Sequence, residues 1–145
     1  MRITDNLIED ISNAPDWFFD AIKIEPQECE IENVKGNLSY SKWQCEPKNT
    51  NLLILIHGTG AHKKWWYPIA PQFTKNTNVI AVDLPGMGDS GFREKYSIKD
   101  FGQCIISIIE KEKSDMLIDN VSIVGHSLGG PVSYTHLTLP TIVGV

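Results

Sequence analysis

The sequence predicts an α/β protein in which an N-terminal hairpin leads into a mostly parallel sheet with helices on both faces. Three observations support this fold class. Short runs of β-branched and other apolar residues recur along the chain, as expected of strands that are buried on both faces. Helical segments separate these runs, and such alternation is typical of parallel β-α-β units. A segment of alternating polarity with a turn after it precedes the first apolar run and predicts the hairpin.

The composition is that of a soluble globular domain, with 145 residues, 41% of them hydrophobic and 21% charged. A net charge of -5 without basic clusters argues against nucleic acid or an anionic membrane surface as a partner. No segment reaches the ~18 apolar residues of a membrane span, and no apolar signal core follows the N-terminus. Cys29, Cys45 and Cys104 form no CxxC pair, which favours free thiols in a reducing compartment. We therefore expect a cytoplasmic protein without a metal or other cofactor.

The first 28 residues are predicted to be a helical extension. Short helices are expected at residues 6–11 and 14–22, and Pro15 suits the first turn of the second. The main domain, residues 29–131, then begins with the hairpin. Its strands are expected at residues 29–34 and 38–44 on either side of a glycine-containing turn.

Three continuous apolar runs predict strands that are covered on both faces, at residues 52–56, 79–82 and 121–124. Between the first two runs, residues 65–73 are predicted to form a short helix that prolines interrupt near its start. Between the last two, residues 97–113 place apolar side chains at a period of about 3.6 residues. Ser97 and Asp100 suit a capped start for this second helix.

The segment Gly125-His126-Ser127-Leu128-Gly129 directly follows the third apolar run. A Gly-x-Ser-x-Gly turn after a buried strand lifts a serine hydroxyl above a parallel sheet, where it can act as a nucleophile. The turn is sharp and strains the serine backbone, so both flanking positions must be small. Gly125 and Gly129 meet this requirement, and the position after a strand favours a nucleophile over an ordinary glycine-rich turn.

Two further motifs follow the other predicted strands, His57-Gly58-Thr59-Gly60 after the first and residues 83–90 after the second. Parallel strands bring such segments to one edge of the sheet, where ligands bind in this class of protein. Together and in this order, the three motifs resemble the N-terminal half of the α/β-hydrolase fold family. The stretch 60–71 is similar to the epoxide-hydrolase- and esterase-like branch of that family. The resemblance covers residues 29–130.

The resemblance assigns roles to three residues. Ser127 would be the nucleophile, and the backbone N–H groups of Thr59 and Leu128 would form the oxyanion hole. Two fixed N–H groups that face the developing negative charge lower the barrier of acyl transfer. Because the nucleophile is a serine and not an aspartate, attack on an acyl carbon is favoured over opening of an epoxide or haloalkane.

The implied function is a hydrolase that cleaves an ester or related acyl bond of a small molecule. The same motifs also serve amidases, lipases and hydrolases of carbon–carbon bonds. A non-catalytic ligand-binding receptor on the same fold is the alternative, and a nucleotide-binding oxidoreductase a distant third. The segment Gly86–Gly91 matches GxGxxG. A dinucleotide site would need a helix that opens at the third glycine, and none is predicted there.

The neighbouring polar residues are expected to have structural roles. His57 and His126 should shape loops rather than transfer protons. Asp83 should fix the next turn through side-chain-to-backbone hydrogen bonds. Lys63 and Lys64 are expected to form a solvated patch.

For His62, Trp65 and Trp66, the sequence is compatible with more than one position of the side chain. His62 lines the pocket or lies on the surface at a helix entry. Trp65 and Trp66 are adjacent and cannot share a helix face, so one is expected in the core and the other at a pocket.

The residues after Ser127 depart from the family pattern. They contain one histidine, His136, and no acid, whereas such a serine needs an acid and then a histidine. Residues 132–143 are rich in β-branched side chains and include a proline, so they are expected to form a poor helix after the turn.

Written with one choice of codons, residues 132–141 resemble the translated adapter of transposase-based sequencing libraries, with Pro131 at the junction. The sequence therefore predicts that residues 132–145 are a non-native tail and that the chain is a fragment without its triad acid and histidine. Such a fragment is expected to be inactive. Its last buried strand, residues 121–124, would become an exposed sheet edge.

Overall fold

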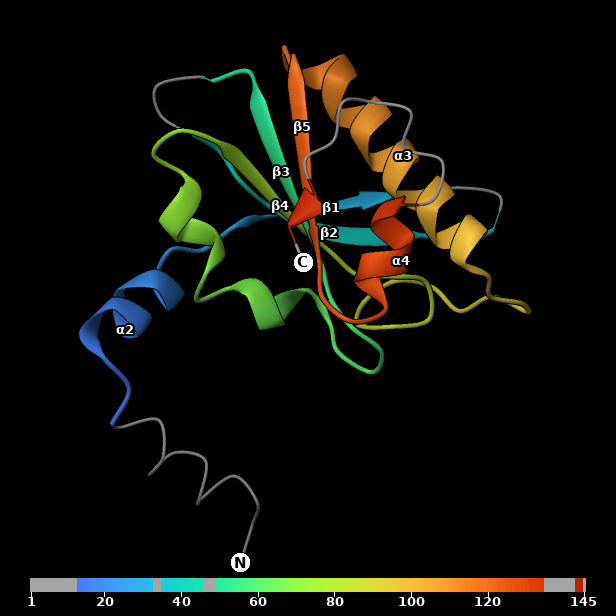
Figure 1. Cartoon of the computed structure of the whole chain (residues 1–145), viewed down its shortest axis with the longest axis horizontal. Helices are drawn as coiled ribbons and strands as arrows, with labels where there is room; N and C mark the ends of the chain where they lie inside the picture. Colours follow the sequence, from blue (N-terminus) through green and yellow to red (C-terminus); the bar gives the residue numbers. More distant parts are fainter. Residues whose placement is uncertain (1–12, 33–34, 46–48, 135–142, 145) are drawn as a thin grey trace, which may run out of the picture.

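The computed structural model describes residues 13–32, 35–45, 49–134 and 143–144, which form a mixed sheet between two layers (Figure 1). The strands are β1 (Gln27–Ile31), β2 (Leu38–Trp43), β3 (Asn51–Ile56), β4 (Asn78–Val82), β5 (Asn120–Gly125) and β6 (Val143–Gly144). The α-helices are α2 (Asp16–Ile22), α3 (Ile98–Asp115) and α4 (Gly129–Tyr134). Two 3-10 helices, η1 (Lys63–Trp66) and η2 (Ala70–Phe73), lie between β3 and β4.

The strand order is β1-β2-β4-β3-β5-β6, with β3 at the centre of the parallel part. β3 pairs in parallel with both β4 and β5, because a helical connection returns the chain to the same end of the sheet each time. β1 and β2 form the predicted antiparallel hairpin, and β2 lies antiparallel to β4. The predicted fold class and all five predicted strands are confirmed. β1 begins at Gln27, two residues inside the predicted helical extension.

The core lies on both faces of the sheet, as predicted, although the face of β5 that carries Ser122 and Val124 is only partly buried. On one face, alternate residues of the parallel strands, among them Ile54, Ile80 and Ile123, pack against Ile105 and Ile108 of α3. On the other face, a smaller cluster joins the remaining alternate residues to η1 and η2. Its members include Leu53, Leu55, Val79, Trp66 and Ala70. Figure 1 shows α3 and α4 on one side of the sheet and the green segment with η1 and η2 on the other.

α3 begins as its sequence predicts. Ser97 is the N-cap, and its Oγ accepts a hydrogen bond from the backbone N–H of Asp100 at 3.1 Å. The same hydroxyl donates to the Asp100 carboxylate at 2.6 Å. α2 lies inside the predicted segment 14–22 and is also confirmed, whereas the helix expected at residues 6–11 lies outside the described residues.

The single helix expected at residues 65–73 is wrong, because the chain forms the two separate 3-10 turns η1 and η2. Their hydrogen bonds span three residues, as in Tyr67 N–H to the Lys64 carbonyl at 3.2 Å. Pro68 and Pro71 have no N–H group, so the segment cannot continue as a regular α-helix.

Two expectations for the end of the chain are also corrected. α4 extends to Tyr134 although its last residues are poor helix formers. The fully buried side chain of Val132 belongs to the larger core cluster, and this packing outweighs local propensity. β5 is not wholly an edge, because its Ile123 and Val124 pair with β6. Residues 135–142, with His136 among them, lie outside the described residues.

No helix within the described residues is long and apolar enough to cross a membrane. The three cysteines are free thiols, with Cys45 and Cys104 buried and Cys29 partly buried.

Candidate active site

The ends of three strands meet at one edge of the sheet. Ile56, the last residue of β3, lies opposite Val82 of β4 on one side and Gly125 of β5 on the other. The His57, Asp83 and Ser127 motifs therefore start side by side. The sequence prediction that parallel pairing brings these motifs together is confirmed.

Ser127 lies on a strained turn between β5 and α4, with its side chain exposed. Its φ angle is 52°, and no other non-glycine residue in the described part of the chain has a positive φ. A serine in this region costs roughly 1–3 kcal/mol of backbone strain, which the surrounding structure must offset. The turn therefore presents the hydroxyl at the sheet edge in the manner that the Gly-x-Ser-x-Gly pattern predicts.

The flanking glycines are required by space. A Cβ atom on Gly125 would overlap the backbone carbonyl of Gly129, and one on Gly129 would lie 2.6 Å from the Ile56 carbonyl oxygen. At Gly130, no atom of the described residues other than the chain neighbours and the backbone of α4 lies within 4 Å of such an atom. The predicted need for small residues on either side of the serine is thus met at Gly125 and Gly129, where β5, β3 and α4 come close together.

The backbone of the turn is held on both sides of Ser127. The His126 N–H donates to the Ile56 carbonyl at 3.0 Å and extends the β3–β5 ladder by one residue. The Gly129 and Gly130 N–H groups donate to the carbonyls of His126 and Ser127 and begin the first turn of α4. Among the described residues, the N–H of Leu128 donates no hydrogen bond.

The loop that follows β3 contacts this turn. A Cβ atom on Gly58 would lie 3.1 Å from the Cβ of Ser127 and 3.0 Å from Nδ1 of His126. Thr59 is the next residue and is exposed, and within the described residues its N–H, too, donates no hydrogen bond. The three residues that the sequence assigns to the site, Ser127, Thr59 and Leu128, therefore belong to two adjoining segments.

His57 is fully buried at the start of this loop. Its Nδ1 donates to the Gly58 carbonyl at 2.7 Å, and its Nε2 accepts from the Leu84 N–H at 3.1 Å. Burial lowers the pKa of His57, although the Gly58 carbonyl and the charge of Asp83 favour the protonated form. Both ring nitrogens are engaged with backbone, so the expectation that His57 shapes loops is confirmed.

His126 is exposed and stacks on Trp65, with ring centroids 5.9 Å apart and planes inclined by 21°. Trp65 is 58% exposed, whereas Trp66 is 8% exposed and belongs to the smaller core cluster. One tryptophan therefore lies in the core, as expected, and the other stands beside the serine turn. His62 is exposed, which supports the surface interpretation of the two left open by the sequence.

Asp83 fixes the corner after β4, as predicted. Its carboxylate accepts from the backbone N–H of Asp89 at 2.9 Å and from that of Lys63 at 2.6 Å. The GxGxxG segment is part of the same corner, and the Gly86 N–H donates to the Gly91 carbonyl at 3.0 Å. The next helix, α3, begins only at residue 98, so the helix that a dinucleotide site requires does not open at Gly91.

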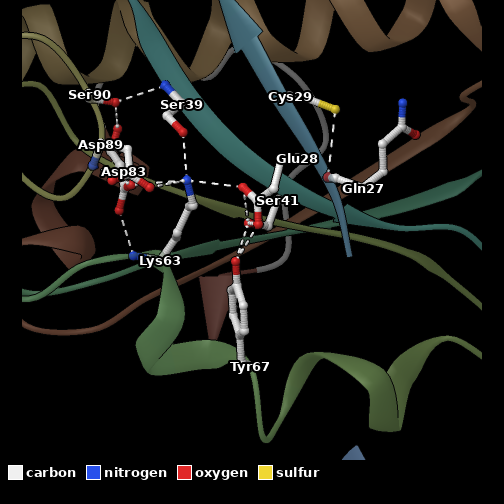
Figure 2. Close-up of polar contacts among 10 residues, drawn as sticks. All are labelled: Gln27, Glu28, Cys29, Ser39, Ser41, Lys63, Tyr67, Asp83, Asp89 and Ser90. Carbon is white, nitrogen blue, oxygen red and sulfur yellow. Dashed lines mark hydrogen bonds and ion pairs between the residues drawn. The ribbon is translucent and has the colours of Figure 1, made fainter. Parts of the chain in front are cut away.

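The expectation of a solvated lysine pair is wrong for Lys63, which is 2% exposed, and correct for Lys64, which is exposed. Figure 2 shows the Lys63 ammonium inside a polar cluster. Its Nζ lies 2.6 Å from Ser39 Oγ, 2.9 Å from Asp89 Oδ2, 3.1 Å from Glu28 Oε2 and 3.4 Å from Asp83 Oδ2.

The cluster keeps Lys63 charged. Burial alone would lower the pKa of Lys63, but the surrounding carboxylates outweigh burial and raise it. Glu28 also accepts hydrogen bonds from Tyr67 at 2.5 Å and Ser41 at 2.9 Å. The sequence gives no signal for this cluster, because its members are far apart in the chain and Lys63 has another lysine beside it.

The arrangement can support acyl transfer by a serine. Ser127 is exposed on a strained turn that adjoins the loop after β3. Within the part of the chain that the structure describes, the N–H of Leu128 in the turn and that of Thr59 in the loop donate no hydrogen bond. Fixed donors of this kind stabilise an oxyanion. Within the described residues, no group of three or more His, Cys, Asp or Glu side chains could hold a metal ion.

Several known proteins are similar to this chain in sequence or in fold. Two curated relatives are pimeloyl-[acyl-carrier protein] methyl ester esterase from Pseudoalteromonas atlantica and (E)-2-((N-methylformamido)methylene)succinate hydrolase from Acinetobacter baylyi. Each is 32% identical over 93 residues, which is 62% and 63% of this chain but 33% and 34% of the relative. The chain therefore spans about a third of the length of the curated relatives it matches.

A solved structure of the Cif epoxide hydrolase from Acinetobacter nosocomialis superimposes with a TM-score of 0.61 and 32% identity. This match covers 74% of the present chain and 32% of the epoxide hydrolase. Epoxide hydrolase CorEH shares the fold, with a TM-score of 0.66 at 22% identity over 75% of this chain and 36% of CorEH. The model of the "Alpha/beta hydrolase family" matches residues 53–145, more than half of the sequence, and the chain therefore belongs to that family.

Proposed function

We propose that this chain is the N-terminal part of a hydrolase that cleaves an ester or related acyl bond of a small molecule. Ser127 is the nucleophile, and the backbone N–H groups of Thr59 and Leu128 form the oxyanion hole. The observation that carries the proposal is the φ of 52° at an exposed serine between β5 and α4. Backbone strain of this kind is retained at functional sites, and here it holds the hydroxyl clear of the sheet.

The reaction would proceed through an acyl-enzyme. The Ser127 Oγ attacks the acyl carbon while its proton passes to a histidine, and the carbonyl electron pair moves onto the oxygen. The two N–H groups hold that oxyanion. It collapses with loss of the alcohol, which takes the proton from the histidine, and water then repeats the sequence to release the acid. The histidine and its orienting acid are proposed to lie in the rest of the longer protein.

A serine at position 127 favours an acyl substrate over an epoxide. Opening of an epoxide by a serine would leave an alkyl ether, which water does not hydrolyse, whereas acylation leaves an ester that water can cleave. One curated relative is named as a methyl ester esterase, and the other as a hydrolase of a succinate derivative. The first of these names supports ester chemistry within the family.

We also infer that the natural sequence departs from this chain after Pro131. The resemblance of residues 132–141 to a translated sequencing adapter supports this, and amplification of the locus from source DNA tests it. A natural reading frame that continues through Tyr134 to a stop codon would contradict the inference. The product of that amplification is also the protein in which turnover is measured.

The decisive experiment labels the longer protein with a fluorophosphonate probe. The wild type is expected to react, and Ser127→Ala is expected to lose labelling and ester turnover together. Ser122→Ala is the matched control, because Ser122 lies in β5, the strand that leads into the turn, and is partly buried. This control should label like the wild type.

Labelling that persists in Ser127→Ala would remove Ser127 from the mechanism. A protein that neither labels nor turns over any ester but binds small acyl compounds would instead support the non-catalytic receptor. We propose a cytoplasmic location, which the three free thiols support, since secreted proteins more often pair their cysteines.

A further inference from the structure

The buried ammonium of Lys63 joins four segments of the chain. Its partners are Glu28 in β1, Ser39 in β2, and Asp83 and Asp89 in the corner after β4. Lys63 itself is the first residue of η1 (Figure 2). An ammonium has three N–H donors, and Ser39, Asp89 and Glu28 lie close enough to take one each. The side chain is therefore fully committed to this position.

Lys63 ends the loop that carries Thr59, and His57 begins it. At the His57 end, the imidazole accepts the Leu84 N–H at 3.1 Å. At the Lys63 end, the backbone N–H donates to the Asp83 carboxylate at 2.6 Å, and the ammonium lies 3.4 Å from the same carboxylate. Both ends of the loop, His57 and Lys63, are thus bonded to the adjacent residues 83 and 84. These two contacts restrict the positions of the loop residues 58–62.

The middle of the loop has little support of its own. Thr59 and Gly60 are exposed, and Gly60 has a φ of 73° with no atom within 4 Å of a Cβ placed on it. Within the described residues, the hydrogen bond between backbone groups inside the loop runs from Ala61 N–H to the Gly58 carbonyl at 3.2 Å. The direction of the Thr59 N–H therefore depends on the two ends of the loop and on the close approach of Gly58 to the serine turn.

The serine turn is held by different contacts. The His126 N–H bonds to the Ile56 carbonyl, and Gly125 packs directly against Gly129. None of the side chains around the Lys63 ammonium belongs to this turn. Loss of the ammonium should consequently disturb the loop and leave the nucleophile in place.

We propose that Lys63 is a positioning residue whose buried ammonium ties η1 to the hairpin and to the β4 corner and so holds the Thr59 N–H beside the serine turn. This inference rests on the proposed function, in which the Thr59 N–H is a donor of the oxyanion hole. It adds that one oxyanion donor is set by a polar cluster that reaches from β1 to the corner after β4. Burial of a lysine is costly unless the charge is paired, so the cluster favours one loop geometry over looser ones.

Hydrogen–deuterium exchange on this chain tests the proposal without any need for catalysis. In Lys63→Met, peptides that cover residues 57–66 are expected to exchange about tenfold faster, because the loop opens locally. Peptides that cover β5 and α3 should keep their wild-type rates. Lys64→Met is the matched control, since it removes an exposed charge from the neighbouring position and should change neither region.

Ser39→Ala gives a second and milder test. It removes a hydroxyl 2.6 Å from the ammonium and touches neither the loop nor its backbone hydrogen bonds. If the ammonium acts through its partners, faster exchange should again be confined to residues 57–66. Should Lys63→Met fail to fold, this variant alone decides. Wild-type exchange of the loop in Ser39→Ala, or equal acceleration across β5 and α3, would overturn the proposal.

Turnover by the longer protein separates this inference from the proposed function. Lys63→Met should lower kcat by about a hundredfold with little change in KM, as expected for a misplaced transition-state donor. Labelling of Ser127 by the fluorophosphonate should continue, although more slowly, and Lys63→Arg should recover part of the lost kcat. A wild-type protein that does not react with the fluorophosphonate would refute the proposed function. An unchanged kcat in Lys63→Met would refute only the role of Lys63.

Discussion

The backbone carbonyl of Gly129 occupies the space that a side chain on Gly125 would need. β5 and α4 therefore cross at a distance that only glycine permits. The next glycine, Gly130, lies in the same helix, but within the described residues no atom other than those of its chain neighbours and its own helix backbone lies within 4 Å of a Cβ atom placed on it. These neighbouring positions give a direct measure of how tightly the serine turn is built.

Gly125→Ala is expected to destabilise the protein by about 1–3 kcal/mol, because backbone rather than a flexible side chain must move aside. Gly130→Ala should cost less. Within the described residues its methyl group would meet no atom beyond the chain neighbours and the backbone of its own helix, and the penalty for a helical residue before Pro131 is partly offset by the higher helix propensity of alanine. Urea unfolding followed by far-UV circular dichroism measures both. Equal effects at the two positions would show that the strand–helix crossing is looser than described.

The buried imidazole of His57 predicts a pH dependence of stability. Burial lowers its folded-state pKa below the ordinary value of 6.5, so the unfolded chain binds the proton more readily. The contribution of His57 is complete above pH 6.5 and declines as the pH falls from there through the lower folded pKa. The slope is at most about 1.4 kcal/mol per pH unit.

Urea unfolding at a series of pH values on both sides of 6.5 measures this slope. His57→Gln keeps a donor and an acceptor for the Gly58 carbonyl and the Leu84 N–H but cannot be protonated in this range. It should flatten the profile. An identical slope in the variant would mean that His57 is not responsible.

A buried ion pair under α3 predicts a strong asymmetry between single and double substitutions. Lys42 Nζ lies 3.0 Å from a carboxylate oxygen of Glu112, with the two side chains 7% and 1% exposed. The Tyr40 hydroxyl donates to the other oxygen at 2.6 Å. Lys42→Met leaves the carboxylate buried without its cation and is expected to cost about 3–5 kcal/mol.

Combining Lys42→Met with Glu112→Leu should recover part of that loss, because no unpaired charge remains in the core. Denaturant midpoints of the wild type, both single variants and the double variant complete the cycle. A double variant that is less stable than Lys42→Met alone would contradict this account.

The adjacent tryptophans should respond in opposite ways to truncation. Trp66→Ala empties a site in the core cluster that includes Leu53 and Ala70 and is expected to cost about 3–5 kcal/mol. Trp65→Ala removes a side chain that is 58% exposed, so its effect should stay within about 1 kcal/mol. Thermal unfolding of the two variants tests this, and comparable losses would show that Trp65 also supports the core.

Local patterns in the sequence determined the strands, the capped helix and the serine turn. The apolar runs at β3 and β4 are buried on both faces, whereas the run at β5 is buried on one face and partly buried on the other. The Ser97–Asp100 cap depends on residues three apart. Gly125 and Gly129 satisfy a steric requirement of the turn itself. Parallel pairing then brings the motifs of His57, Asp83 and Ser127 to one edge. The apolar runs, the helix cap and the glycine spacing each involve residues close together in the sequence. Residue type and spacing encode such features, so they can be predicted from the sequence.

Only the tertiary structure decided which polar residues are buried and what they contact. Lys63 and Lys64 are chemically identical in the sequence, yet one is enclosed by side chains from β1, β2 and the β4 corner and the other is exposed. The length of α4 was likewise set by the buried Val132 rather than by helix propensity. Burial depends on which distant segments the sheet brings together, and no local pattern carries that information.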